Sequence, residues 1–367
     1  MSVAINGTNG ITYNDGSLQP SAPVGKNIII NGNMQIAQRA TSTSSITNNG
    51  YHTVDRFQTF NDTMGTWTQS QSTTAPSGQG FATSLKMDCT TADASPAVGD
   101  RLGIRQQFEG QNIQLLKYST SSAETTTLSF WVRSNKTGTY IVELYGPSTD
   151  RQISKSYTIS SADTWEKKTI TFVGDTGGTY NNDNSNELII SWYLGAGSDY
   201  TSGTLSTTWG AKTDADRAVG QVNLADSTSN EWYITGVQLE ANTTATPFEN
   251  LQYGTQLELC QRYYQQYGSS SVTPIGAGVW FTTTQVLGLL TFPVIMRTAP
   301  TITTTGTGWI KAYRDGSSTA TGSGFFDSIG NHSARFNMSG WDVAGTAGMG
   351  AYLQLVADKY IFISAEL

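Results

Sequence analysis

One stretch of the chain, residues 251–267, has the spacing of an amphipathic helix, and it limits the folds that the rest can adopt. Its sequence is LQYGTQLELCQRYYQQY. Apolar and aromatic side chains recur on one face at helical intervals, namely Leu257, Cys260, Tyr264 and Tyr267. A glycine and three serines then end it. Because nearly everything on either side has the pattern of strands and turns, we predict an all-β protein whose two β-regions are joined by one short connector helix, residues 251–268.

The composition excludes several classes of protein. Charged residues are 13% of the 367, about half the usual ~25%, and Thr, Ser, Asn, Gln and Gly take their place. Such a surface is typical of a stable extracellular or virion β-protein rather than of a cytosolic enzyme. The 9 Trp, 17 Tyr and 13 Phe are enough to build packed cores. With a net charge of −7 the chain offers no general basic surface, so we expect no nucleic-acid partner.

The sequence has no recognisable export signal, membrane span or cysteine framework. Met1 leads into Ser-Val-Ala-Ile-Asn-Gly without a basic or a long apolar segment, so we expect no signal peptide. No run of about 18 apolar residues occurs, so we expect no membrane insertion. Cys89 and Cys260 lie far apart and match neither a disulfide framework nor a zinc spacing, which predicts two buried free thiols. A surface-type composition without an export signal fits release by cell lysis, as for a virus particle.

Residues 1–26 have the pattern of two short strands. Apolar residues alternate between Asn-Gly and Asp-Gly turns, at Val3, Ile5, Ile11 and Tyr13. So small a piece cannot bury a core, so we expect it to pair with copies of itself or with a larger assembly. Its GITYNDGSLQ resembles a G-I-x-F-x-D-G-T-x-Q segment near the starts of tail-fibre and other appendage proteins of tailed bacteriophages. The resemblance implies an N-terminal virion-attachment segment that contacts other virion proteins.

Residues 27–250 have the spacing of a two-sheet jelly-roll sandwich. An apolar run and its alternation predict an opening strand over 27–39. Further strands separated by Gly, Asn, Asp or Ser turns are predicted at 55–60, 66–70, 82–89, 103–108, 126–134, 139–145, 151–159, 165–172, 187–194 and 232–240.

The two ends of this region resemble the jelly rolls of carbohydrate-binding modules. The family's opening strand often reads L-I-x-N-G-D-F-E, and residues 29–35 read IINGNMQ. Its closing strand reads Y-I-D-D-V-x-L, and residues 233–239 read YITGVQL. In that family the two strands supply acidic ligands to a structural calcium. Here Asn33, Gln35 and Thr235-Gly236 replace the acids that calcium needs, so we predict neither metal nor cofactor.

Residues 230–267 carry the longest resemblance in the chain. The sequence NEWYITGVQLEANTTATPFENLQYGTQLELCQRYYQQY is similar to the F-x-I-T-G-V-Q-L-E-x-G…A-T-P-F-E…E-L-x-L-C-Q-R-Y-Y segment of phage tail-fibre and virion structural proteins. Because this segment runs from the end of the jelly roll into the helix, we expect the two to form one continuous module.

Residues 269–367 are predicted to form a second β-sandwich, the receptor-binding tip. Its strands are expected at 278–284, 286–292, 301–305, 309–314, 323–329, 334–337 and 352–365. The apolar end of the chain, residues 361–367, is expected to be tied into a sheet or an intersubunit contact.

No catalytic residue is predicted. His52 and His332 lie in different regions and have no partners for a Ser/His/Asp set. Carboxylates occur as single turn residues, and the chain lacks the long repeats of the β-helices that phage depolymerases usually carry. We therefore expect a protein that is not an enzyme, with a glycan depolymerase as the least favoured alternative.

Aromatic residues beside turns are the candidate glycan-binding site. A flat apolar ring with polar neighbours suits a sugar, and the last region offers such a set, with intersubunit packing as the competing role: Trp309, Tyr313, Arg314, Asp315, Trp341 and Asp342. The tryptophans inside apolar strands are expected to be core residues, namely Trp131, Trp165, Trp192 and Trp232.

The favoured interpretation is a homotrimeric phage tail fibre that attaches to a host-surface glycan as part of the virion. Trimerisation follows from the tail-fibre resemblance and from a second apolar row on the helix. The expected contact residues are Leu257, Leu259, Cys260, Tyr263 and Tyr264. The alternative is a carbohydrate-binding module that decorates the capsid or tail without recognising the host.

Overall fold

The computed structural model describes residues 4–6, 10–12, 18–19, 25–314 and 318–367. It divides the chain into two compact units. The first consists of Met1–Gln35, Ser42–His52 and Phe57–Gln252, and the second of Ile36–Thr41, Thr53–Arg56 and Tyr253–Leu367. Two short segments from near the start of the chain therefore belong with the C-terminal half, which no pattern in the sequence indicated.

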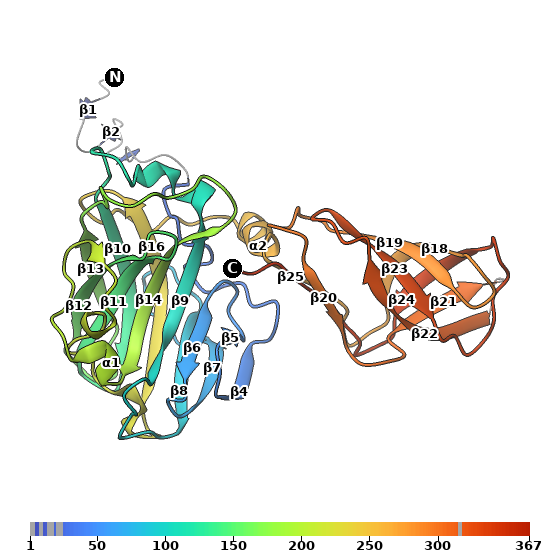
Figure 1. The fold of residues 1–367 in the computed structure, drawn as a ribbon, viewed down its shortest axis with the longest axis horizontal. Coiled ribbons are helices and arrows are strands. Elements are labelled where there is room, and N and C mark those ends of the chain that lie inside the picture. Colours follow the sequence, from blue (N-terminus) through green and yellow to red (C-terminus); the bar gives the residue numbers. More distant parts are fainter. Residues whose placement is uncertain (1–3, 7–9, 13–17, 20–24, 315–317) are drawn as a thin grey trace. The chain divides into compact units, whose positions relative to one another are not determined.

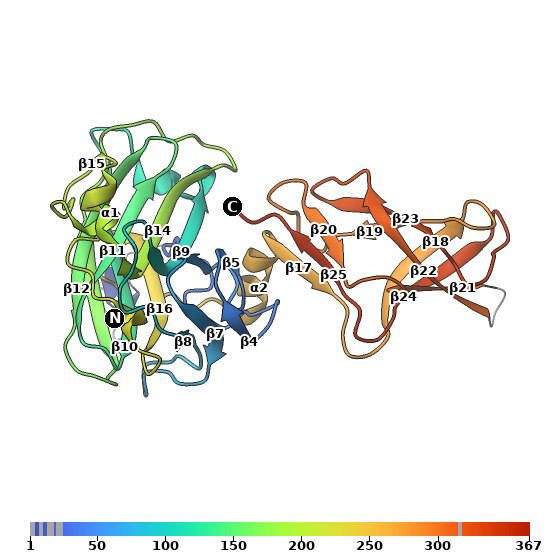
Figure 2. The same ribbon diagram turned by 60° about the horizontal axis from the view of Figure 1, so that its bottom comes forward.

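The first unit is a jelly-roll sandwich, as predicted, with two antiparallel sheets packed face to face (Figures 1 and 2). One sheet has six strands in the order β13-β10-β16-β8-β7-β4, and the other has seven in the order β15-β12-β11-β14-β9-β6-β5. In chain order, β4 to β16 are Ser42–Ile46, Gly50–Tyr51, Gln58–Asp62, Thr66–Ser72, Ser84–Thr91, Arg101–Glu109, Thr126–Ser134, Gly138–Gly146, Arg151–Ile159, Glu166–Phe172, Asn186–Ala196, Gly210–Ala211 and Glu231–Ala241. A single helical turn, α1 (Ser198–Thr201), follows β14.

The core between the two sheets is aromatic. Trp192 and Trp232 are fully buried, as predicted, and the Trp192 ring lies 6.0 Å from Phe130 of the facing sheet. The prediction was wrong for Trp131, in β10, and for Trp165, which directly precedes β13; both are half-buried because they face away from the core. Successive residues of a strand point to opposite faces, so a strand tryptophan belongs to the core only at every second position.

The N-terminal residues that the structure describes include the two predicted strands. β1 (Ala4–Asn6) pairs antiparallel with β2 (Gly10–Thr12), with Ile5 opposite Ile11. A two-residue strand, β3 (Leu18–Gln19), pairs with β2.

The predicted opening strand over 27–39 is wrong, because this segment contains turns instead of a strand. Asn31 and Met34 have φ values of 62° and 59°, which an extended strand does not allow. Its backbone groups are instead paired with β16: the Ile28 amide donates to the Leu239 carbonyl, and Gly32 accepts from Val237, each at 2.9 Å. The segment thus closes the sandwich without adding a strand.

The Ala-Thr-Pro-Phe-Glu motif at 245–249 holds this arrangement together through hydrogen bonds to β16 and to the segment over 27–35. The Thr246 hydroxyl donates to Glu240 at 2.7 Å, and the Glu249 amide donates to Gln238 at 2.8 Å. The Glu249 carboxylate accepts from the Asn27 amide at 2.9 Å. The motif therefore fastens the connector and the opening segment to the closing strand.

The second unit begins with a helix that is shorter than predicted. α2 covers Tyr253–Gln261, and the following Tyr264–Tyr267 form strand β17 instead of further helical turns. Here β17 pairs antiparallel with β25 (Ile361–Ser364), with Tyr264 opposite Ser364. Hydrogen bonding to a distant strand has overridden the local helical spacing.

The predicted second β-region is confirmed, but the prediction of a sandwich there is wrong, because six strands close into a barrel in the order β18-β19-β23-β22-β21-β24. A three-stranded sheet β17-β25-β20 accompanies it. Strands β18 to β24 are Thr273–Trp280, Val286–Thr291, Thr301–Thr304, Ile310–Arg314, Ser318–Asp327, Ser333–Ser339 and Gly350–Leu355. The single strand predicted over 352–365 is two strands, because the chain turns at Asp358, whose φ is 59°. As predicted, both cysteines are free and buried.

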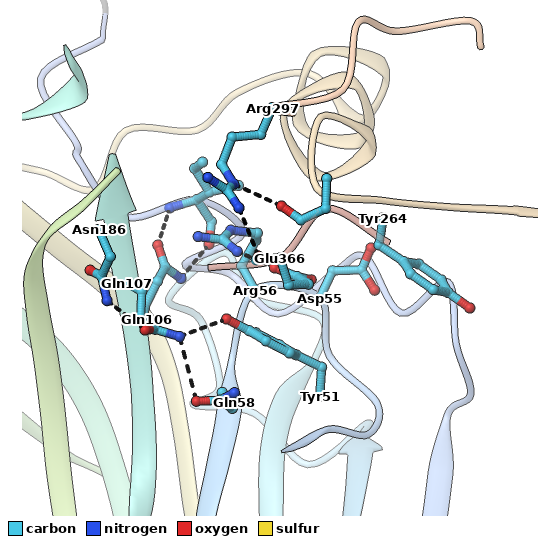
Figure 3. Close-up of polar contacts among 12 residues, drawn as sticks. Tyr51, Asp55, Arg56, Gln58, Gln106, Gln107, Asn186, Tyr264, Arg297 and Glu366 are labelled. Atoms are coloured by element: carbon cyan, nitrogen blue, oxygen red, sulfur yellow. Dashed lines mark hydrogen bonds and ion pairs between the residues drawn. The ribbon is translucent and has the colours of Figure 1, made fainter. Parts of the chain in front are cut away.

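Three arginines and two carboxylates form a partly buried cluster within the second unit, with Asp55 and Arg56 at its buried centre (Figure 3). Arg39 lies 3.1 Å from Glu366 and 3.9 Å from Asp55, and Arg56 forms an ion pair with Glu366. Arg297 donates to the Ala365 and Glu366 carbonyls at 2.8 and 3.0 Å. Burial raises the pKa of Asp55 to about 6, although Arg39 and Gln38 act in the opposite direction.

We predict that Asp55 makes the second unit less stable as pH rises. Its folded pKa of about 6 lies above the ordinary 3.8, so the folded state binds the proton more tightly between these values. The stabilisation is complete below pH 3.8 and is lost as pH rises through about 6, with a total of about 3 kcal/mol. Calorimetry of the wild type and of Asp55→Asn between about pH 3.8 and pH 6 measures this change in stability. Parallel stability profiles would contradict the assignment.

We predict that Gly236→Ala destabilises the first unit by about 1–3 kcal/mol. Gly236 has a φ of 62°, and a Cβ there would lie 2.6 Å from the Phe81 ring. Denaturant unfolding measures the change. The matched control is Gly210→Ala in β15, where no atom lies within 4 Å of the added Cβ. Equal stability of the two variants would contradict both the backbone strain and the Phe81 contact proposed for Gly236.

Candidate functional site

A groove lies on the outer face of the seven-stranded sheet, the face that does not pack on the second sheet. It has a volume of about 290 Å³, at the small end of ligand sites. Strands β6, β9, β11 and β14 form its floor, and the segment after β14 forms its wall. The residues that line it are Phe60, Arg101, Arg105, Tyr145, Ile189, Ser191, Tyr193, Tyr200, Lys212, Asp214 and Arg217.

Aromatic side chains hold the floor and wall together. Phe60 and Tyr193 pack edge to face with ring centroids 5.5 Å apart, and both are buried. Tyr200 and Leu205, from the wall segment, pack against them. Tyr145 and Tyr200 remain half-buried, so part of each ring is open to the groove. A ring that is partly exposed beside polar groups is a surface on which a sugar can stack.

A buried ion pair fixes the wall to the floor. Arg217 donates to both carboxylate oxygens of Glu143, at 2.7 and 2.8 Å, and also to Asp214 at 3.2 Å. Burial lowers the pKa of Arg217, but Glu143 outweighs it and the net shift is upward. Glu143 is 0% exposed and both its oxygens accept from this arginine, so it does not reach the groove surface as a nucleophile or general base.

An array of amide side chains continues along the same face of the sheet (Figure 3). Asn186 donates to Gln107 at 2.7 Å, and Gln107 donates to the Tyr51 hydroxyl at 3.1 Å. Gln58 accepts from Gln107 at 3.5 Å and from the Nε of Arg105 at 2.5 Å. Amides both donate and accept hydrogen bonds, as sugar hydroxyl groups require.

A second groove lies on the outer face of the six-stranded sheet, with a volume of about 430 Å³. Phe81 and Phe248 pack edge to face at 5.1 Å on one side of it. Trp131 and Lys167 also line it. Its aromatic surface makes it the competing candidate for a ligand site.

The structure does not support every residue of the predicted glycan site. Trp309 is 1% exposed and stacks on Phe326 in the barrel core, so the prediction of a surface platform is wrong there. Tyr313 is half-buried beside Tyr352, and Trp341 is half-buried against Trp280. Asp342 is exposed and accepts from the Thr321 amide.

The other members of that set cannot be placed as a site. Asp315 lies outside the described residues, and the Arg314 side chain is likewise not described. The role of Tyr313, Trp341 and Asp342 in glycan binding therefore stays a prediction.

Three of the five predicted oligomerisation residues are wrong, because they are buried within their own unit. Cys260, Tyr263 and Tyr264 are 0%, 1% and 5% exposed. The guanidinium groups of Arg56 and Arg39 lie over the Tyr263 and Tyr264 rings, at 3.5 and 3.6 Å.

The remaining two oligomerisation residues stay predictions. Leu259 is 37% exposed and Leu257 is half-buried.

Sequence reasoning missed the groove, although part of its signal was present. The strands over 103–108 and 187–194 were predicted, and their alternation places Arg105, Ser191 and Tyr193 on the face opposite the apolar residues. The pattern does not reveal that these two strands are neighbours in one sheet. The wall residues come from a segment without periodicity.

Among the described residues, no group of three or more His, Cys, Asp and Glu side chains is arranged to hold a metal ion. No helix in the described part of the chain is long and apolar enough to cross a membrane.

We predict that Glu143→Gln destabilises the first unit by about 3–5 kcal/mol, because it removes the buried counter-charge of Arg217 and leaves only the exposed Asp214. The double variant Glu143→Leu/Arg217→Met is expected to recover most of the loss. Thermal unfolding measures both. The control is Lys117→Gln, which removes one partner of the exposed pair with Glu124 and is expected to cost less than about 1 kcal/mol. Equal effects of Glu143→Gln and this control would refute the role of the buried pair.

No protein-family profile matches the chain, and no curated protein matches it. Among solved structures, it is similar to the enzymatically active domain of tailspike protein 4 of bacteriophage CBA120, with 13% identity and a TM-score of 0.31. This match covers 59% of the chain and only 22% of the tailspike chain.

Two further solved structures are also similar. One is a putative sugar binding protein from Bacteroides thetaiotaomicron, with 12% identity, a TM-score of 0.33, and 59% and 100% of the two chains covered. The other is the family 11 carbohydrate-binding module from Clostridium thermocellum in complex with a mixed-linked tetrasaccharide, with 11% identity, a TM-score of 0.27, and 56% and 98% covered. Since these TM-scores are below 0.5, none bears on what this chain binds.

Proposed function

We propose that the first unit is a glycan-binding module and that the groove on its seven-stranded sheet is the binding site. The observation that carries the proposal is the meeting of two half-exposed tyrosines, Tyr145 and Tyr200, with arginines and an amide array on one sheet face. Stacking surfaces beside groups that donate and accept hydrogen bonds are what a sugar ring requires.

Binding without catalysis is favoured by how the carboxylates of the groove are paired. A glycosidase needs two carboxyl groups that are free to act as acid and as base or nucleophile. In this groove Asp214 lies 3.2 Å from Arg217 and 3.7 Å from Lys212, and Glu143 is held by Arg217 from below. We therefore propose a protein that is not an enzyme.

We further propose that the chain is a structural protein of a tailed-phage particle, a homotrimeric tail fibre that attaches the virion to a host-surface glycan. The resemblance of residues 10–19 and 230–267 to appendage proteins supports this proposal. A module that decorates the capsid or tail is the alternative. Electron microscopy of the assembled virion separates them, because a decorating protein covers the shell whereas a fibre projects from the tail.

We predict that Tyr145→Ala and Tyr200→Ala each weaken glycan binding by at least roughly tenfold, because each removes a stacking surface. A glycan array identifies the ligand, and calorimetric titration measures the affinity. Trp131→Ala, in the second groove, is the matched control and should leave the affinity unchanged. The reverse pattern would move the site to the six-stranded sheet, and release of reducing sugar by the wild type would refute the non-enzymatic proposal.

We predict that the full chain has the mass of a trimer in light scattering, three times 39.5 kDa. Leu259→Asp is expected to lower this mass, since Leu259 is the exposed apolar residue of the predicted contact set. A monomeric wild type would refute the homotrimer.

A further inference from the structure

We infer that the groove selects acidic glycans, with Arg105 binding a carboxylate or sulfate group of the sugar chain; this rests on the proposed glycan-binding function. Three of the four basic residues that line the groove lie close to carboxylates, and the fourth, Arg105, does not among the residues that the structure describes. Arg101 forms an ion pair with Asp62, and Arg217 with Glu143. Lys212 lies 3.7 Å from Asp214 and 3.9 Å from Asp150.

Arg105 is the exception among these four residues. Its partner is the neutral side-chain amide of Gln58, and the contact uses only the Nε hydrogen, at 2.5 Å from Oε1. Within the described part of the chain, no carboxylate lies within ion-pair distance of its guanidinium group. The contact with Gln58 is also the one hydrogen bond that the Arg105 side chain makes to the described residues, so the four hydrogens on its two terminal nitrogens are available to a ligand.

The geometry of this contact prepares Arg105 for an anion. Gln58 fixes the Nε edge of the planar guanidinium, and Gln107 in turn donates to Gln58. The Phe60 ring lies 5.9 Å from the guanidinium carbon and limits its movement. A guanidinium held by one edge presents its remaining donors as a fork, which matches two oxygens of a carboxylate or sulfate.

The position of Arg105 also makes an anion more favourable than water. Burial lowers the pKa of Arg105, which reflects the loss of water around its charge. An anion that enters the groove restores hydrogen bonds and charge balance to this side chain, so it gains more here than at an exposed arginine. The net charge of −7 opposes an acidic ligand at long range, but salt at about 0.15 M screens charges beyond about 8 Å.

Two matched pairs of polymers test the inference with the full chain. They are methyl-esterified polygalacturonate with free polygalacturonate and dextran with dextran sulfate, so that the members of one pair differ only in free carboxylates and those of the other only in sulfates. Affinity electrophoresis and calorimetric titration at about 0.15 M salt measure binding. At least one acidic polymer is expected to bind at least roughly tenfold more tightly than its neutral counterpart. Which of the two does so identifies the anionic group.

Two variants test the role of Arg105. Arg105→Gln removes the cation, and Gln58→Glu keeps it but supplies a carboxylate partner of nearly the same shape from within the chain. Both are expected to lower the affinity for the acidic polymer by at least roughly tenfold. Lys117→Gln changes the net charge as Arg105→Gln does, but on an exposed side chain away from the groove, and should have no effect.

The outcomes separate the inference from the proposed function. Equal affinity for the neutral and acidic members of both pairs would overturn the inference and leave glycan binding intact. Wild-type affinity of Arg105→Gln or Gln58→Glu for the acidic polymer would overturn it as well. If neither these polymers nor any glycan on an array binds, the proposed function fails, and the inference fails with it.

Discussion

Charged side chains on the outer face of the seven-stranded sheet are held partly or wholly away from water, and this constraint governs how that face is built. A buried charge is tolerated only when a partner and hydrogen bonds replace the lost water. Glu143 meets this requirement by accepting from Arg217, which joins the wall segment to the sheet. The ion pair between Arg217 and Glu143 therefore both holds the wall of the groove in place and neutralises the Glu143 charge in its floor. Arg105 has only an amide partner, and this difference makes it informative about a ligand.

Backbone hydrogen bonding imposes a second constraint on the irregular parts of the first unit. The segment over 27–35 and the connector over 242–250 are not strands, yet their polar groups are paired with β16 or with each other. Glu249, Gln238 and Thr246 connect these segments to the closing strand by hydrogen bonds. The residues of ITGVQLE and ATPFE thus have a structural role in holding these segments together.

Much of the fold was predictable because alternation within a strand and turn residues between strands are local signals. The jelly roll and the second β-region follow from these two signals, and the start of α2 follows from the helical spacing of its apolar residues. The errors occur where a distant partner decides. Tyr264–Tyr267 have helical spacing but pair with β25, and residues 27–39 have an apolar run but contain two left-handed residues. The aromatic signal at Trp309 was real, but it marked a core position rather than a surface, since hydrophobicity alone does not give orientation around a closed barrel.

By itself the sequence determined the class of the fold, the approximate start of helix α2, the reduced state of the cysteines and the absence of a general basic surface. These properties depend on composition or on residues within a few positions of one another. Only the tertiary structure decided the site. Phe60, Arg105, Tyr145 and Arg217 lie on different elements, and they line one groove because β6, β9, β14 and β11 are consecutive neighbours in a sheet. Strand order is set by which distant edges pair, and no local pattern encodes that choice.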